Sequence, residues 1–354
     1  MTDFSVAYRG KKVLVTGHTG FKGSWLSLWL QSLGADVVGY ALSPETEPSH
    51  LTLLDLDMVS VKGDIRDFSH LQRLIKDVQP EIIFHLAAQP LVRRSYREPV
   101  ETFETNVMGT VNVLEACRQT PSVRAIVNIT SDKCYENREW VWGYRENDPM
   151  GGYDPYSASK GAAELVSAAY RRSYFNNAEY GKIHETLLAT CRAGNVIGGG
   201  DWSEDRLIPD IVRAVTAKEA VTIRSPNATR PWQHVLDALS GYLLLGQKLL
   251  EGQSEFADAW NFGPSDEDVL TVKEMCSLFE KEWERTRFNF SKETPRLHEA
   301  GLLKLDCSKA HTLLNWRGRW HAQEAVIATA EWYRAYIETG KILSREQLKK
   351  WMDT

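Results

Sequence analysis

Short apolar runs alternate with longer amphipathic segments over the first half of the chain. Runs of three to eight mostly apolar residues, bounded by glycine, proline or charged residues, are typical of buried β-strands. We predict such strands at residues 12–16, 36–41, 59–61, 81–86, 124–130 and 185–192. Between several of them, apolar residues recur every three to four positions and indicate helices, as at residues 24–30 and 99–118. Strands alternating with helices predict a parallel, doubly wound α/β sheet, with its ligand site outside the carboxyl ends of the strands.

A glycine-rich turn follows the first predicted strand and precedes a predicted helix. Its glycines have the spacing G-x-x-G-x-x-G. Glycines let the backbone approach a pyrophosphate closely, and the helix start offers N–H groups and the positive end of the helix dipole. Strand, glycine turn and helix together predict a dinucleotide-binding site. The residues of the turn predicted to bind the cofactor are Gly17, Thr19, Gly20, Phe21, Lys22 and Gly23.

The pattern becomes mixed beyond residue 180. Apolar spacing there predicts helices and a short strand, at residues 207–215, 221–223 and 235–250. A last helical stripe ends near Gly340, and it consists of Val326, Ala330, Tyr333 and Ile337. We therefore predict a Rossmann-type domain over residues 1–180 and a smaller, mixed α/β substrate-binding domain over residues 181–354, interleaved with the first.

Other strand ends offer further contacts for a dinucleotide. Asp64, next to Ile65, would bond the adenine amino group; alternatively Asp64 or Asp67 only caps the next helix. Residues after the fourth strand would let the cofactor lie against it, namely Leu86, Ala87 and Ala88. The second strand ends without the usual acidic residue for the adenosine ribose, so that contact stays unassigned. No Lys or Arg occurs from residue 34 to 61, which favours NAD over NADP because a 2′-phosphate would lack a counter-charge.

Two polar residues lie within apolar segments. His85, in the fourth strand, is expected to be a core residue with satisfied hydrogen bonds rather than a base or a ligand. Asn106 lies inside the helix predicted at residues 99–118. It would face solvent, bend the helix or hold a water.

Tyr156 and Lys160 stand four residues apart at the start of a predicted long helix. Positions i and i+4 share one helix face, so the hydroxyl and the ammonium would lie side by side. A nearby cation stabilises phenolate and lowers a tyrosine pKa, which would let Tyr156 take a proton from a substrate alcohol. With a hydride acceptor, this pair predicts the oxidation of an alcohol. Ser131, Asp132 and Lys133 follow the fifth strand, at the edge where the site is expected.

Composition and charge exclude several classes of partner. The 354 residues are 43% hydrophobic and 25% charged, as in ordinary globular proteins. A net charge of −5 offers no general attraction to nucleic acid or to an anionic membrane. Five scattered cysteines favour neither a disulfide framework nor a zinc site, so we expect no metal and a cytoplasmic location. No signal core and no apolar run of about 18 residues occurs, so no membrane span is expected.

Three motifs together resemble the extended short-chain dehydrogenases/reductases. They are the glycine turn, the pair Tyr156-x-x-x-Lys160 and the loop Arg192-x-x-Asn195. Members of this family bind NAD(P) in a Rossmann fold and mostly act on nucleotide-diphosphate sugars. The resemblance covers essentially the whole chain. Within the family, residues 130–133 are similar to the Ser/Thr-Asp-Glu of sugar 4,6-dehydratases, with lysine in place of glutamate, whereas 4-epimerases generally lack the aspartate.

The resemblance implies a reaction in which NAD ends as it began. Tyr156, with Lys160, would take the proton of the sugar C4 hydroxyl while C4 gives hydride to NAD. A base would remove the C5 proton, an acid would protonate the C6 hydroxyl so that water leaves, and hydride would return to C6. Ser131 would bond the C4 oxygen, and a protonated Asp132 would be the acid at C6. Lys133 replaces the usual base and would serve only as a neutral amine, so the base at C5 stays open.

The expected substrate is a nucleotide-diphosphate sugar, and the resemblance alone implies CDP-glucose. Arg206 and Arg230 are candidates for the diphosphate, because guanidinium binds phosphate bidentately; for each, a surface ion pair is the alternative. Asn195 would hold a phosphate or a sugar hydroxyl. Trp202 or Trp232 would stack on sugar or base, although Trp232 is more expected in the core. The product, a 4-keto-6-deoxy sugar, would serve deoxysugar biosynthesis, as for a lipopolysaccharide O-antigen.

Other functions stay open. A nucleotide-sugar 4-epimerase, or a dehydratase for another nucleotide, would use much of the same site, and Asp132 favours the dehydratase. A non-catalytic NAD-binding regulator on the same fold would be free to lose Tyr156 and Lys160, but both are present. The resemblance further implies a homodimer in which the helices at residues 99–118 and 156–175 of two copies form a four-helix bundle.

Overall fold

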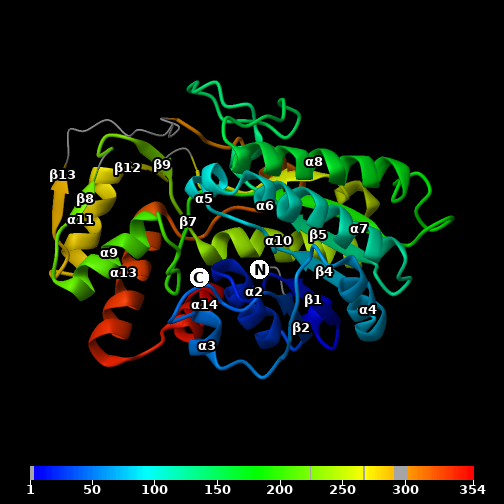
Figure 1. Ribbon diagram of the computed structural model, residues 1–354, viewed down its shortest axis with the longest axis horizontal. Coiled ribbons are helices and arrows are strands. Elements are labelled where there is room, and N and C mark those ends of the chain that lie inside the picture. The colour runs from blue at the N-terminus through cyan, green and yellow to red at the C-terminus, as the bar shows by residue number, and fades with distance from the viewer. Residues whose placement is uncertain (1–3, 224, 266–267, 291–301) are drawn as a thin grey trace.

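The computed structural model describes residues 4–223, 225–265, 268–290 and 302–354. Its centre is a sheet of seven parallel strands in the order β11-β6-β5-β4-β1-β2-β3 (Figure 1). The strands are β1 (Lys12–Thr16), β2 (Asp36–Ala41), β3 (Val59–Lys62), β4 (Ile82–His85), β5 (Ala125–Ile129), β6 (Leu187–Arg192) and β11 (Ala259–Asn261). The predicted doubly wound sheet is confirmed. Its strand order reverses direction at β1 and β4, which is where ligands bind in such sheets.

Helices cover both faces of this sheet (Figure 1). One face packs against α2 (Phe21–Ser32) and α10 (Val235–Leu250), and the other against α4 (Phe68–Val78), α7 (Gly109–Arg118) and α8 (Pro155–Ser173). Each face of the sheet has its own hydrophobic core, and alternate residues of β1 lie in the two cores. Val13 and Val15 lie in the first and Leu14 lies in the second. Burial on both faces explains why the strands are almost continuously apolar.

The predicted helix at residues 99–118 is not a regular α-helix. It consists of α6 (Pro99–Phe103), a π-helical turn η1 (Glu104–Met108) and α7. Asn106 is buried in the π-helical turn. It was predicted to face solvent, bend the helix or hold a water, and the structure shows a distorted helix at this residue. Its side chain accepts a hydrogen bond from Gln89 N (2.8 Å) and donates to Gln89 O (3.0 Å) and Ser159 Oγ (2.8 Å). The turn thereby joins the segment after β4 to α8.

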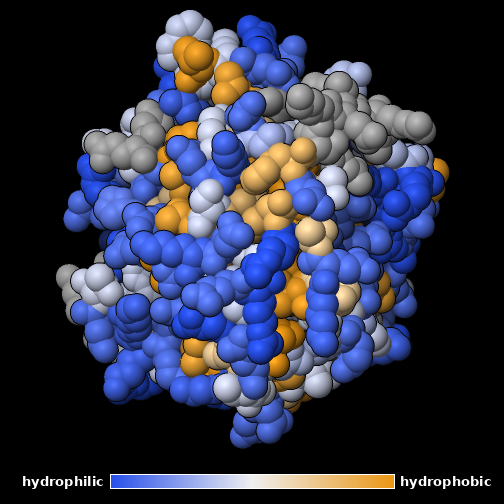
Figure 2. All heavy atoms as spheres, turned by 90° about the vertical axis from the view of Figure 1, so that its left-hand side faces the viewer, coloured by the Kyte–Doolittle hydropathy of each residue, from blue (hydrophilic) through white to orange (hydrophobic). Residues whose placement is uncertain are grey.

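The smaller part of the chain forms the other end of the molecule (Figure 1). Its helices are α9 (Leu207–Ala217), α11 (Val272–Glu282), α12 (Ser308–Leu313) and α13 (Ala322–Thr339). Gly340 caps α13, so the predicted end of this helix near Gly340 is confirmed. Its short strands pair as β7 (Val196–Ile197) with β10 (Gln233–His234), β8 (Val221–Ile223) with β13 (Phe288–Phe290), and β9 (Thr229–Pro231) with β12 (Val269–Thr271). Figure 2 looks onto this end, where hydrophilic side chains prevail and hydrophobic groups gather toward the middle.

Segments after residue 180 also complete the central sheet. β6 and β11 lie at one edge of it, and α10 packs across its face. The remaining elements are α1 (Ser5–Tyr8), α3 (His50–Leu54), α5 (Val92–Arg97), α14 (Ser344–Asp353) and two 3-10 turns, η2 (Asp132–Cys134) and η3 (Ser254–Phe256). Since all strands of the sheet are parallel, the segments that follow β1, β4, β5 and β6 leave it at one edge. Among the helices of the described ranges, none has the length and apolar character needed to cross a membrane.

Candidate active site

A cavity of about 580 Å³ opens at the carboxyl edge of the sheet. Every residue predicted to bind the cofactor lines it, from the glycine turn to Tyr156 and Lys160. Trp202 and Arg206 of the smaller part line it as well. The volume lies within the range of small-molecule sites. The predicted contacts thus surround one continuous space, and their binding roles stay predictions.

The glycine turn fits closely between β4 and the start of α2. Gly17 has a φ of 77°, and a Cβ there would lie 2.6 Å from the backbone nitrogen of Ala87. A Cβ on Gly23 would lie 2.1 Å from the carbonyl oxygen of Gly17. The helix starts after Gly20, whose lack of a side chain leaves the first N–H groups without a side-chain cap. The turn therefore fits a pyrophosphate group that would accept hydrogen bonds from this helix end.

Charged residues that sequence analysis did not identify line the cavity near Asp64. Asp64 accepts a hydrogen bond from Arg66 Nη2 at 2.6 Å, and Asp67, rather than Asp64, caps α4. Arg94 of α5 donates to Glu45, which follows β2, at 2.9 Å. Arg66, Arg94 and Glu45 all line the cavity. An ion pair therefore joins the loop after β2 to α5 at this cavity.

Tyr156 and Lys160 lie one turn apart near the start of α8, and both are buried. Burial raises the pKa of Tyr156 to about 12; a hydrogen bond with Ser131 opposes the rise, and the negative charge of Asp132 adds to it. The predicted net lowering of this pKa is therefore wrong, because burial dominates and Lys160 donates to the carbonyl oxygen of Ile129 at 3.5 Å. Burial also lowers the pKa of Lys160 to about 8.

Ser131 connects Tyr156 with Asp132. Its hydroxyl donates to Asp132 Oδ1 at 3.0 Å, and its effect on Tyr156 is to lower the pKa of that tyrosine against the effect of burial. The Asp132 carboxylate packs against Gly194 so closely that a Cβ at residue 194 would lie 1.8 Å from Oδ2. Tyrosine, serine and aspartate thus form a chain of groups that can handle protons at neighbouring atoms of one substrate.

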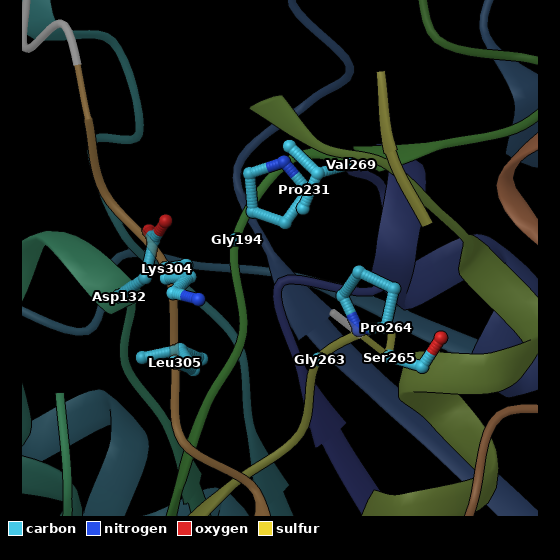
Figure 3. Close-up of a pocket in the computed structure, with 9 residues that line it drawn as sticks. All are labelled: Asp132, Gly194, Pro231, Gly263, Pro264, Ser265, Val269, Lys304 and Leu305. Atoms are coloured by element: carbon cyan, nitrogen blue, oxygen red, sulfur yellow. The ribbon is translucent and has the colours of Figure 1, made fainter. Parts of the chain in front are cut away.

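Asp132 also lines a second, small cavity of about 10 Å³ that Figure 3 shows in close-up. Asp132, Lys304 and Leu305 lie along one side of it, and Pro264 and Ser265 along the other (Figure 3). The smaller part of the chain supplies most of this lining. Asp132 is therefore placed at the junction of the two parts.

Lys133 is not among the residues that line either cavity. Its side chain is half-buried, and its backbone N–H donates to Ser131 Oγ at 3.2 Å. The contact of Lys133 with the site is thus made by its backbone. Its predicted catalytic role stays a prediction.

Glu164 and Arg192 form a buried ion pair behind the site, which sequence analysis did not identify. Arg192 Nη2 donates to Glu164 Oε2 at 2.8 Å, and Thr130 and Thr190 also donate to this carboxylate. Burial alone would raise the pKa of Glu164, but Arg192 and the two hydroxyls lower it below its usual value. Arg192 Nη1 donates to Tyr135 at 2.6 Å. The pair therefore fixes both ends of the segment that carries Ser131 and Asp132. Glu164 follows Lys160 by four residues, which is the signal that places both on one helix face.

Arg206 and Trp202 face the large cavity from the smaller part of the chain. Arg206 Nη1 donates to Asp201 Oδ2 at 2.9 Å, so Arg206 forms an ion pair, which was the alternative to a role in binding diphosphate. Arg206 nevertheless also lines the cavity. Trp202 packs edge-on against Trp332, with ring centroids 5.7 Å apart. Both side chains are positioned by neighbours and reach the site from the side opposite the sheet.

Neither Asn195 nor Arg230 lines one of the two cavities. Each is next in the sequence to a residue that lines the small cavity, since Asn195 follows Gly194 and Arg230 precedes Pro231. Asn195 has a left-handed φ of 49°. Arg230 lies on β9 and donates to the carbonyl oxygen of Thr229 at 2.8 Å. Trp232 is buried in the core, as expected. The two substrate candidates thus flank the small cavity, and their roles stay predictions.

Comparison with known proteins identifies the class to which this chain belongs. Residues 14–329 match the model of the GDP-mannose 4,6 dehydratase family. The chain belongs to this family, a group of extended short-chain dehydrogenases/reductases that matches the resemblance predicted from its motifs.

Two curated dehydratases are similar to this chain over most of its length. The chain is 53% identical over 349 residues to the CDP-glucose 4,6-dehydratase of Salmonella typhimurium strain LT2. The aligned residues cover 98% of this chain and 97% of that protein. It is 26% identical to a dTDP-glucose 4,6-dehydratase of Xanthomonas campestris pv. campestris, over 90% of this chain and 92% of that protein.

Solved structures share the fold over nearly the whole chain. The epimerase Mth375 of Methanothermobacter thermautotrophicus superposes with a TM-score of 0.80 at 25% identity, covering 97% of this chain and 96% of that one. A double mutant of DesIV, a dTDP-glucose 4,6-dehydratase of Streptomyces venezuelae with NAD bound, superposes with a TM-score of 0.75 at 25% identity, covering 91% and 96%. The Rossmann-type fold predicted from the sequence is thereby confirmed.

Proposed function

We propose that the protein converts CDP-D-glucose to CDP-4-keto-6-deoxy-D-glucose and water, with NAD as its cofactor. The 53% identity to a CDP-glucose 4,6-dehydratase over nearly the full length supports the substrate. The observation that carries the reaction is the placement of Tyr156 at the large cavity beside the buried pair of Ser131 and Asp132, in which Ser131 Oγ donates to Asp132 Oδ1 at 3.0 Å. Oxidation at C4 and loss of water across C5 and C6 need proton-transferring groups at neighbouring carbons, and this chain supplies them.

The first step is the oxidation of C4. NAD would be held by the glycine turn at residues 17–23, and when bound it would supply the hydride acceptor for C4 and the hydride donor for C6. Tyr156 takes the proton of the C4 hydroxyl, and Ser131 donates a hydrogen bond to the C4 oxygen. Burial raises the pKa of Tyr156 to about 12, so the phenolate needs a neighbouring cation. Lys160, one turn along α8, would supply it by turning from the carbonyl oxygen of Ile129 toward Tyr156.

The second step is the elimination of water. The ketone at C4 makes the C5 proton acidic, so a base can remove it while the C6 hydroxyl leaves. Asp132 would donate a proton to that hydroxyl. Only 3% of Asp132 is exposed, so this part of the site is shielded from bulk water. The residues that hold the nucleotide end would be Arg206, Asn195, Arg230 and Trp202.

A nucleotide-sugar 4-epimerase is the second candidate, and the fold likeness to the epimerase Mth375 favours it. An epimerase oxidises C4 and reduces it again on the other face, so it needs the tyrosine and the cofactor but no acid at C6. Epimerisation at C4 needs no proton transfer at C6, so it gives the buried Asp132, which accepts a hydrogen bond from Ser131, no catalytic role. The dehydratase is therefore preferred.

We also propose that two copies form a homodimer and that the enzyme works in the cytoplasm. Large apolar side chains are exposed along α6, η1 and α8, where they would pack against a second copy. They are Val100, Phe103, Met108 and Leu165, which are 69%, 40%, 53% and 62% exposed. Figure 1 shows these elements lying alongside one another on one side of the molecule. Burying such groups typically contributes about 1.5–3 kcal/mol each, which would favour association.

The proposed reaction is tested by incubating the protein with NAD and one nucleotide sugar at a time in deuterated water. CDP-glucose, dTDP-glucose, UDP-glucose and GDP-mannose are compared, and product mass and label position are read by NMR. We expect loss of water from CDP-glucose only, deuterium at C5 and no accumulated NADH. An unlabelled C4 epimer would instead support the epimerase.

A further inference from the structure

The loop that follows β2 supplies an acid that the end of the strand itself lacks. In Rossmann folds an acidic residue at that place accepts a hydrogen bond from the 2′-hydroxyl of the adenosine ribose. Here Leu42 and Ser43 follow the strand, and the next acid is Glu45, which lines the large cavity. We propose that Glu45 binds this ribose and, by neutralising Arg94, excludes the 2′-phosphate of NADP. The inference rests on NAD as the cofactor of the proposed function.

The loop that carries Glu45 is held beside the glycine turn. At its start, the carbonyl oxygen of Leu42 accepts a hydrogen bond from Thr19 Oγ1 at 3.1 Å. At its end, His50 Nδ1 lies 2.8 Å from the hydroxyl of Ser24 on α2, the helix that follows the turn. Most of the loop lines the cavity together with the turn, namely residues 42, 43, 45, 46 and 49. Glu45 is thus carried by a segment that borders the predicted pyrophosphate site at both ends.

The fold brings arginines to this end of the cavity from other segments of the chain. Arg94 of α5 and Arg66, which follows β3, both line the cavity. In Rossmann folds an arginine beside the adenosine ribose accommodates the 2′-phosphate of NADP. The lack of Lys and Arg from residue 34 to 61 therefore does not by itself exclude NADP. The choice of cofactor depends on which carboxylates occupy the two guanidinium groups.

Both guanidinium groups are bound by carboxylates. Arg66 donates to Asp64 Oδ2 from Nε at 2.9 Å and from Nη2 at 2.6 Å. Arg94 Nη1 donates to Glu45 Oε1 at 2.9 Å, and Arg94 Nη2 donates to Glu101 Oε2 at 3.2 Å. Glu45, Asp64 and Glu101 also line the cavity, so three carboxylates accompany the two guanidinium groups there. A 2′-phosphate would add about two negative charges to a region that is already acidic, which opposes its binding.

Glu45 differs from the other acid that binds Arg94 from outside the cavity. Glu98 accepts a hydrogen bond from Arg94 Nε at 3.0 Å, but Glu98 is not among the residues that line the cavity. Its carboxylate neutralises part of the charge of Arg94 and is not placed to meet a ribose. A carboxylate has about four acceptor sites, so Glu45 can bind Arg94 and a ribose hydroxyl at the same time.

The test measures cofactor binding and needs no nucleotide sugar. NAD or NADP displaces NADH from the full-length protein, and the loss of NADH fluorescence gives each affinity. We expect wild type to bind NADP on the order of a hundredfold more weakly than NAD. In Glu45→Gln, NADP should bind about tenfold more tightly, because Arg94 becomes available to the phosphate. The affinity for NAD should change at most about fivefold, since glutamine still offers an acceptor.

Two further variants test whether the effect depends on Arg94. Glu98→Gln is the matched control, because it removes a carboxylate from the same guanidinium group outside the cavity. It should keep the ratio of NADP to NAD affinity within about twofold of wild type. Adding Arg94→Met to Glu45→Gln should abolish the gain in NADP affinity.

The ribose contact is tested with 2′-deoxy-NAD as the competing ligand. Wild type should bind it about tenfold more weakly than NAD, and Glu45→Ala should bind the two equally. The proposal is overturned if Glu45→Ala keeps the wild-type preference or if Glu45→Gln keeps the wild-type ratio of NADP to NAD affinity. It is also overturned if Glu98→Gln changes that ratio as much as Glu45→Gln does, or if the double variant keeps the gain.

Failure of the proposed function would give a different result. A protein that shows this pattern of binding but dehydrates no CDP-glucose would contradict the dehydratase and still support the ribose contact. A wild type that binds neither dinucleotide would contradict NAD as the cofactor, and this proposal with it.

Discussion

Tyr156 is the residue on which C4 oxidation depends most directly. We predict that Tyr156→Phe lowers dehydratase turnover on the order of a thousandfold, because the C4 hydroxyl loses its proton acceptor. Tyr170→Phe is the matched control, since it lies on the same helix and its hydroxyl donates to Glu115 at 3.4 Å, away from the site. Steady-state rates, with melting temperatures to check folding, decide the point. Comparable rates for the two variants would remove Tyr156 from the reaction.

Asp237 on α10 gives stability a distinct dependence on pH. Burial raises its pKa from the ordinary 3.8 to about 6, although N–H groups of Arg319 and Trp351 donate to Oδ1 at 2.8 and 2.9 Å. The folded protein therefore holds this proton more tightly than the unfolded chain does. The contribution of Asp237 to stability is present below about pH 4 and is lost as pH rises through about 6.

We predict that Asp237→Asn removes this loss. The free energy of unfolding of the variant relative to wild type should rise by about 2–3 kcal/mol between pH 4 and pH 7. Urea denaturation at the two pH values measures the difference, and comparing the two proteins cancels the other titrating groups they share. A difference that stays constant with pH would contradict the assignment of this pKa.

Motif spacing predicted which residues meet at the cofactor cavity, because glycine turns and helix faces are local features. It also predicted His85 correctly as a core residue, with Nδ1 2.7 Å from Thr16 Oγ1. Arg94 and the pair of Glu164 and Arg192 could not be found in this way, because their importance comes from contacts with segments far away in the chain. The effect of burial on the pKa of Tyr156 was likewise hidden, since burial is a property of the whole fold.

At the scale of elements, an ion pair joins the loop after β2 to α5 at the cofactor cavity. Glu45 and Glu98 both bind Arg94, at 2.9 and 3.0 Å, but only Glu45 reaches it from the loop. We predict that Glu45→Gln speeds the dissociation of NAD about two- to fivefold, the scale of a solvent-exposed ion pair, while Glu98→Gln leaves it unchanged. Stopped-flow displacement of NAD measures both rates. Equal rates in both variants would show that the pair does not retain the cofactor.

Regular elements with a strong apolar period were predictable, and those fixed by tertiary contacts were not. The strands of the sheet and the helix α10 follow directly from their sequences. The π-helical turn at residues 104–108 depends instead on the hydrogen bonds of Asn106 to Gln89 and Ser159, which join separate segments. β7 and β10 comprise two residues each and exist through their mutual pairing, so their sequences alone carry no signal.

At the scale of the whole molecule, the exposed apolar face of α6, η1 and α8 predicts association. We expect the wild-type protein to sediment as a dimer and Leu165→Glu to shift it toward monomer, because a buried charge without a partner opposes the contact. Leu313→Glu on α12 is the control, since Leu313 is similarly exposed, at 59% against 62%. A monomeric wild type, or an equal effect of both substitutions, would contradict a dimer through this face.

The meeting of the two parts of the chain at Asp132 is a feature of the whole fold. The sequence predicted a Rossmann-type sheet and the edge at which its site lies, since strand order and handedness follow general rules. It did not predict the small cavity, because Asp132, Gly194 and Lys304 come together only when the smaller part packs against the sheet.

One labelled substrate can show whether hydride moves from C4 to C6 within one sugar. CDP-glucose carrying deuterium at C4 is incubated with the enzyme and NAD in ordinary water, and the product is analysed by NMR and mass spectrometry. We expect a 4-keto-6-deoxy sugar with the deuterium in the C6 methyl group. Deuterium that remains at C4 of an epimer, or is lost from the product, would contradict it.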